Sequence, residues 1–154
     1  MKIGVLKENK PNEKRVALTP SAVTKIKKLG YEICIESSAG ALSNFFDAAY
    51  EQVGATISSV DEIFKCDILL KINKPSHDEI GKLSSNQTLI SFFSPATNSE
   101  SLQICSKDKL NILSMDSVPR ISRAQKMDAL SSMANVAGSR AVIEAAHYFG
   151  RFFG

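Results

Sequence analysis

The sequence has no apolar run that approaches the ~20 residues that a membrane-spanning helix requires. Met1 leads directly into a strand-like segment, with neither the charged region nor the apolar stretch of an export signal. The 19 basic and 16 acidic residues give a net charge of +3 and form no dense basic block. We therefore expect a soluble chain that inserts into no membrane directly and binds no nucleic acid.

Glycine-rich phosphate-binding turns are also missing. The eight glycines form neither a G-x-G-x-x-G pattern after a strand nor a G-x-x-x-x-G-K-S/T pattern, so the chain has no dinucleotide fingerprint of its own. The cysteines, Cys34, Cys66 and Cys105, lie far apart without the spacing of a metal site, which predicts buried free thiols in a reducing compartment. His77 and His147 lack a partner at the spacing of a catalytic triad or metal site, and we expect both to be structural or solvent-facing.

Apolar runs of strand length alternate with segments of helical period along the 154 residues, which are enough for one ordinary core. Pro20 after Thr19, and the Ser59-x-x-Glu62 and Ser76-x-x-Glu79 patterns, predict helix starts. Expected strands are 2–6, 32–36, 55–57, 67–72, 88–93 and 111–115. Regular alternation of this kind predicts an α/β fold, a three-layer αβα domain spanning 1–154 with a mainly parallel, Rossmann-like or flavodoxin-like sheet.

One long helix is expected at the end of the chain, from about Met127 to Phe149. Its small side chains form one stripe, which includes Ala134, Gly138 and Ala145. A stripe of small residues predicts that another backbone comes close to the helix, either within this domain or from a second one.

Three segments carry a family resemblance: "ENKPNEKRVALTP", "DILLKINKP" and "VPRISRAQKMDALSSMANVAGSRAVIEAAHYFGRFF". Together they resemble the N-terminal part of the alpha subunits of proton-translocating NAD(P) transhydrogenases, and the resemblance spans the whole chain. It implies a component that forms one wall of the NAD(H) cleft, for hydride transfer between NADH and NADP+ coupled to proton translocation.

The same resemblance implies a site in "RISRAQKMDALSS", which in the family forms a loop and helix start beside the nicotinamide. It assigns catalytic and cofactor-binding roles to Arg120, Gln125 and Asp128, a cofactor-binding role to Ser131, and no metal. Arg120 can donate to carboxamide, ribose or phosphate oxygens, while Gln125 and Asp128 can orient one another and the ribose. The alternative is structural: Asp128 as an acid at a helix N-terminus, Arg120 and Arg123 as solvated turn residues, and Ser131 as a surface residue.

Cofactors and partners also follow from the resemblance alone. NAD(H) is expected to be bound mainly by a Rossmann domain that follows this segment in the family and is absent from this chain, which we expect to be inactive alone. NADP(H) is expected on a partner beta subunit. The resemblance further implies a membrane domain as partner, a homodimer in the full enzyme, and a cytoplasmic location that is peripheral to the inner membrane through partner subunits.

Alanine dehydrogenases share the fold and the "RVALTP" segment, and they provide an alternative. In that family an arginine, a lysine and a histidine bind and process the substrate, and the matching positions here are Arg15, Asn73 and Ser94. Without the lysine and the imidazole, amino-acid oxidation lacks its acid–base groups. A third interpretation, a module that only folds or interacts, stays open.

Overall fold

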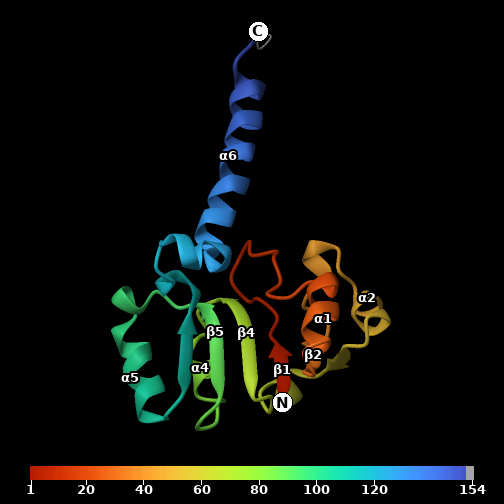
Figure 1. Cartoon of the computed structure of the whole chain (residues 1–154), viewed down its shortest axis with the longest axis vertical. Helices are drawn as coiled ribbons and strands as arrows, with labels where there is room; N and C mark the ends of the chain where they lie inside the picture. The colour runs from red at the N-terminus through yellow and green to blue at the C-terminus, as the bar shows by residue number, and fades with distance from the viewer. Residues whose placement is uncertain (152–154) are drawn as a thin grey trace. The chain divides into compact units, whose positions relative to one another are not determined.

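The computed structural model describes residues 1–151 and contains a six-stranded sheet in which all strand pairs are parallel, in the order β3-β2-β1-β4-β5-β6. In Figure 1, β1 lies between β2 and β4. This order is that of the doubly wound Rossmann sheet, and it confirms the predicted α/β fold. The strands are β1 (Lys2–Val5), β2 (Glu32–Glu36), β3 (Thr56–Ser58), β4 (Ile68–Asn73), β5 (Thr88–Phe92) and β6 (Asn111–Ser114).

Helices cover both faces of this sheet and complete three layers. The α-helices are α1 (Pro20–Lys27), α2 (Asp47–Gln52), α3 (Val60–Ile63), α4 (His77–Ile80), α5 (Ser99–Lys107) and α6 (Ala129–Tyr148). Short 3₁₀ helices are η1 (Ala41–Ser43), η2 (Pro95–Thr97), η3 (Met115–Ser117) and η4 (Ser122–Met127). Helices α1 and α2 contribute to one buried cluster, and α3, α4 and α5 contribute to another. The chain first runs from β1 toward β3 and later from β4 toward β6, so right-handed crossovers in these two directions place their helices on opposite faces of the sheet.

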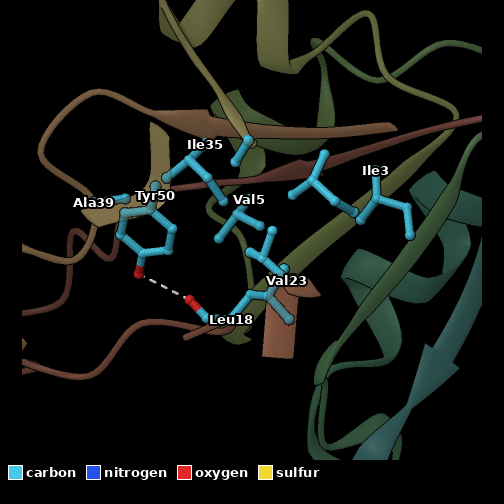
Figure 2. Packing of buried hydrophobic residues seen from close by; sticks show 9 residues of the cluster. Ile3, Val5, Leu18, Val23, Ile35, Ala39 and Tyr50 are labelled. Carbon is cyan, nitrogen blue, oxygen red and sulfur yellow. Dashed lines mark hydrogen bonds between the residues drawn. The ribbon is translucent and has the colours of Figure 1, made fainter. Parts of the chain in front are cut away.

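Alternate residues of the central strands face the two clusters, as in β4, where Ile68 and Leu70 pack with the first cluster and Leu69 belongs to the second. In β1, Ile3 and Val5 pack with α1 and α2, whereas Gly4 faces α3 on the other side. Tyr50 of α2 is fully buried in the first cluster, and its hydroxyl donates to the carbonyl of Leu18 over 2.8 Å (Figure 2). The core therefore satisfies the polar end of its largest side chain from within.

Local signals set most helix starts as predicted. The Thr19 hydroxyl accepts the amide of Ala22, and the capping box of Ser76 and Glu79 forms in full. The capping box predicted at Ser59 is wrong, because the Ser59 side chain makes no capping bond. The Ser59 carbonyl accepts the amides of Glu62 and Ile63, and the Glu62 carboxylate pairs with Lys65.

The described chain divides into two compact units, Met1–Ser114 and the residues from Met115 on. The second unit contains η3, η4 and the 20-residue helix α6, of which no residue is buried. A Cβ added at Gly138 would meet no atom within 4 Å, so the approach of another backbone to the small-residue stripe stays a prediction. Among residues 1–151, no helix combines the length and the apolar character that crossing a bilayer requires.

Candidate functional site

The four residues predicted from the "RISRAQKMDALSS" segment line one cavity at the start of α6. Its volume is about 260 Å³, and it lies within the second unit. Helix η4 and the turn before it supply one side, and the first turn of α6 supplies the other. The lining residues are Arg120, Ile121, Ser122, Gln125, Asp128 and Ser131.

Asp128 holds the junction between η4 and α6. Its carboxylate accepts the backbone amides of Leu130 and Ser131 over 3.0 and 3.1 Å, and the Ser131 hydroxyl donates to its second oxygen over 2.5 Å. Asp128 as a whole is only 6% exposed. Hydrogen bonds from the Ser131 hydroxyl and amide, with smaller contributions from Leu130 and Arg120, hold the pKa of the Asp128 carboxyl below its usual value. Asp128 is therefore an ionised N-cap, as the structural alternative predicted.

The other polar groups of the cavity face solvent. Arg120, Gln125 and Ser131 are exposed, so the guanidinium and amide N–H groups are open to water at the cavity. Gln125 and Asp128 are joined through the backbone, where the Asp128 amide donates to the Gln125 carbonyl over 3.3 Å. In the described residues no side-chain hydrogen bond links these two, so the predicted mutual orientation of their side chains is not formed.

This arrangement suits recognition of oxygen atoms more than acid–base chemistry. Arg120 and Gln125 together offer several N–H donors, and the Asp128 carboxylate is already committed to its own helix. A volume of about 260 Å³ is below the range of typical small-molecule sites, so the cavity can hold one ring or sugar but not a whole dinucleotide. The site can thus position one end of a larger ligand.

A second polar cluster lies at the carboxyl ends of β1 and β4, where the strand order reverses. Glu8 follows β1, and its carboxylate accepts the amides of Ile72 and Asn73 over 2.6 and 3.2 Å, as well as the Asn73 side chain over 2.9 Å. Asn73 also donates to Glu13 over 3.0 Å. Arg15 donates through two nitrogens to both oxygens of Glu13, over 2.7 and 2.6 Å. Such a switch point is where doubly wound sheets place ligands.

Charge pairing is tight in this cluster. The hydrogen bond from Arg15, followed by that from Asn73, outweighs burial and lowers the pKa of Glu13 to about 2. The same pairing with Glu13 raises the pKa of Arg15 above its usual value. Sequence reasoning found Arg15 and Asn73 but missed Glu8 and Glu13. The position of Glu8, three residues beyond the last residue of β1, was the signal that could have found it.

The lysines on either side of Asn73 have partners elsewhere. Lys71 is buried and its ammonium lies 2.5 Å from the Glu79 carboxylate. Lys74 donates to the side chains of Asn98 and Ser101 over 2.7 and 3.0 Å. Neither ammonium therefore replaces the lysine that alanine dehydrogenases use at the position of Asn73.

Ser94, the third position compared with alanine dehydrogenases, follows β5 in the left-handed backbone region with φ of 50°. Its carbonyl accepts the side chains of Thr97 and Asn98. A hydroxyl here provides no imidazole for proton transfer. Residues 1–151 also contain no group of three or more His, Cys, Asp or Glu side chains that could hold a metal ion.

Comparison with known proteins places this fold among relatives of two kinds. The NAD(P) transhydrogenase subunit alpha of Haemophilus influenzae is 48% identical over 153 residues, which cover 99% of this chain and 30% of that protein. The crystal structure of transhydrogenase from Sinorhizobium meliloti matches with a TM-score of 0.92 and 38% identity, over 98% of this chain and 46% of that one. Alanine dehydrogenase 1 of Staphylococcus aureus is 29% identical, over 96% of this chain and 39% of its own length.

The chain spans less than half the length of each of these three proteins. It is homologous to transhydrogenase alpha subunits along nearly its whole length, and its identity to them exceeds that to alanine dehydrogenase. The profile of the family described as "Alanine dehydrogenase/PNT, N-terminal domain" matches residues 4–137. The chain therefore belongs to the family of alanine dehydrogenase/PNT N-terminal domains.

Proposed function

We propose that this chain forms one wall of the NAD(H) cleft of a proton-translocating NAD(P) transhydrogenase. In this function it acts as the N-terminal component of the alpha subunit, and hydride passes between NADH and NADP+. The observation that carries the proposal is the single cavity at the start of α6 that Arg120, Gln125, Asp128 and Ser131 line together. The 48% identity to a transhydrogenase alpha subunit supports it.

Hydride transfer between two nicotinamide rings needs positioning more than proton transfer. The cavity fits that requirement, because its exposed donors can bind a carboxamide or ribose oxygen while Asp128 fixes the start of α6, the helix that follows them. In this proposal Arg120 and Gln125 hold the ring end of NAD(H). Asp128 and Ser131 keep those two groups in place.

The rest of the dinucleotide requires another domain. The chain has no glycine-rich turn at a helix N-terminus to receive a pyrophosphate, and a cavity of about 260 Å³ covers only part of the cofactor. We propose that a Rossmann domain binds most of NAD(H), that NADP(H) is bound by a beta subunit, and that a membrane domain completes the assembly. In this assembly the chain is cytoplasmic and peripheral to the inner membrane, and the alpha subunits form a homodimer.

Alanine dehydrogenase activity is disfavoured by the cluster at the switch point. Asn73 stands at the lysine position and is hydrogen-bonded to Glu8 and Glu13, and the Arg15 guanidinium is paired with Glu13. A substrate carboxylate would have to displace Glu13 from Arg15. Alanine-dependent NADH production should therefore stay at background.

A chimera tests the proposal. This chain replaces the matching segment of the Haemophilus influenzae alpha subunit, which is assembled with its partner components. Single-turnover transfer from NADH to an NADP+ analogue is then measured beside NADH titration. Arg120→Ala should slow transfer at least about tenfold and weaken NADH binding less than about threefold, because Arg120 orients the ring rather than anchoring the dinucleotide.

Arg123→Ala is the matched control, because Arg123 is an exposed arginine of η4 that does not line the cavity. It should transfer at the unmodified rate. Asp128→Asn preserves an N-cap acceptor but removes the charge, and it should fall between the two. Equal rates in the Arg120 and Arg123 variants would refute a role for the cavity in transfer.

A further inference from the structure

A second cavity lies at the amino-terminal end of the sheet, within the first unit. Its volume is about 490 Å³. It is lined by the first residues of β1, β2 and β3, which are Lys2, Glu32 and Thr56. Cys34 and Cys66 line it as well. Two thiols that are 32 positions apart in the sequence thus share one solvent-reachable hollow, which the spacing of the cysteines in the sequence gave no reason to expect.

Gly4 brings these two cysteines together. Cys34 of β2 is in register with Gly4 of β1, so their Cα atoms are about 4.8 Å apart and their Cβ directions share one face of the sheet. A Cβ added at Gly4 would lie only 3.1 Å from the Cβ of Cys66. Cys66 therefore occupies the space above Gly4 that a side chain would otherwise fill, directly beside Cys34. The Cys66 thiol also interacts with the Cys34 side chain at hydrogen-bonding range, and two thiols in contact can close to a disulfide if their Cβ atoms reach the usual separation.

The two thiols differ in exposure. Cys66 is only 2% exposed, whereas Cys34 is half-buried and packs at the margin of the cluster that contains Ile63 and Phe64. Burial raises the pKa of the Cys66 thiol to about 12, and the Cys34 thiol beside it adds to the shift. A molecule that enters the cavity therefore meets Cys34 as the more accessible sulfur, while Cys66 stays protonated behind it.

We propose that Cys34 and Cys66 are a redox-active pair that closes to an intramolecular disulfide when a peroxide reaches the cavity. The Cys34 thiolate attacks one peroxide oxygen, the O–O bond breaks, and Cys34 sulfenic acid and one water result. The Cys66 sulfur then attacks the sulfenic sulfur, loses its proton, and releases a second water. Two electrons pass from the sulfurs to hydrogen peroxide, and the two thiol protons end in water.

The disulfide would link β2 to the residue that precedes Asp67 and β4, across β1. It would cross the floor of the cavity, and thiol reductants would reverse it, as is usual for disulfides in reducing compartments. Cys105 serves as an internal reference. It is buried at 2% exposure in α5 and does not line this cavity.

The experiment treats the reduced 154-residue protein with a small excess of hydrogen peroxide and counts free thiols after denaturation. The count should fall from three to one, and digestion should yield a linked peptide that contains Cys34 and Cys66. Dithiothreitol should restore all three thiols. Cys105→Ala should form the same linked peptide. Cys34→Ala should retain both of its thiols under conditions that oxidise the unmodified protein.

Three results would overturn the proposal. They are a linked peptide that includes Cys105, disulfide-linked dimers in place of the internal bond, and oxidation of Cys34 to sulfinic acid with Cys66 still a free thiol. Cys34→Ser provides a second variant in case the alanine substitution fails to fold, because Cys34 is half-buried and a serine keeps its size. The outcome is independent of transhydrogenase activity, since neither cysteine lines the cavity at α6.

Discussion

The two units of this chain hold their structure by different means. Residues Met1–Ser114 bury two apolar clusters against the two faces of a parallel sheet, whereas the unit from Met115 on buries only Ala124 and Asp128 among its described residues. In α6 the stabilising groups are the backbone ladder, the Asp128 cap and strong helix formers such as alanine. The first unit thus depends on its core, and the second depends on local interactions.

This difference bears on function as well. Side chains in a packed core cannot move without cost, so the sheet can only present groups at its strand ends. At the start of α6, in contrast, the Asp128 cap fixes the backbone, and Arg120 and Gln125 of the cavity remain exposed. Variants that separate core stability from local stability therefore test the comparison directly.

The largest effect is expected from a core truncation. Leu69 of β4 is fully buried in the second cluster, so Leu69→Ala should lower the free energy of unfolding by about 3–5 kcal/mol. Val142→Ala in α6 removes a side chain that is 64% exposed and should change it by less than about 0.5 kcal/mol. Urea titration followed by circular dichroism measures both. Similar losses in the two variants would contradict the comparison.

A buried ion pair should give the next largest effect. Lys71→Met leaves the Glu79 carboxylate without its ammonium partner at a side chain that is 15% exposed, and it should cost about 3 kcal/mol. Burial opposes ionisation of Glu79, but the Lys71 and Ser76 hydrogen bonds together hold its pKa below the usual value. Lys65→Met breaks the exposed pair with Glu62 and should leave the urea midpoint unchanged.

Tyrosine hydroxyls offer a smaller test in each unit. Tyr50→Phe removes the buried donor to the Leu18 carbonyl and leaves that oxygen unsatisfied, so it should cost about 1–2 kcal/mol. Tyr148→Phe changes a residue of α6 that is 81% exposed and should have no measurable effect. Thermal melts of the two variants give the comparison. A stable Tyr50→Phe protein would show that water replaces the lost donor.

Much of the fold was predictable, because hydrophobic period and turn residues act locally. The strand Glu32–Glu36 was predicted to the residue, and the Ser76 capping box formed as its sequence indicated. The pattern at Ser59 failed, since the Ser59 side chain makes no capping bond and the Glu62 carboxylate pairs with Lys65, a residue outside the four-residue pattern. Strand order is also beyond local signals, since it depends on which side each crossover takes.

The sequence predicted which residues lie together at the candidate site, but not which hydrogen bonds they form. Arg120, Gln125 and Asp128 lie on one continuous segment, so their grouping around one cavity follows from sequence proximity and a helix start. That Asp128 caps α6 rather than meeting Gln125 depends on its backbone angles. Glu8 and Glu13 were missed because their partner Asn73 is more than 50 positions away, and only the sheet brings them together.

The smallest effect is the pH dependence contributed by Glu13. Its pKa of about 2 in the folded protein is below its ordinary value of 4.5, so folding favours the ionised carboxylate. The resulting stabilisation is fully present above about pH 4.5 and is lost as the pH falls toward 2. The difference in unfolding free energy between the unmodified protein and Glu13→Gln should therefore shrink as the pH is lowered through this window. Glu32→Gln is the matched control at the surface, since it removes a carboxylate whose side chain is 69% exposed and should change the unfolding free energy only slightly. A pH-independent difference for Glu13→Gln would mean that Arg15 and Asn73 bind the protonated and ionised carboxyl equally, which would contradict the lowered pKa.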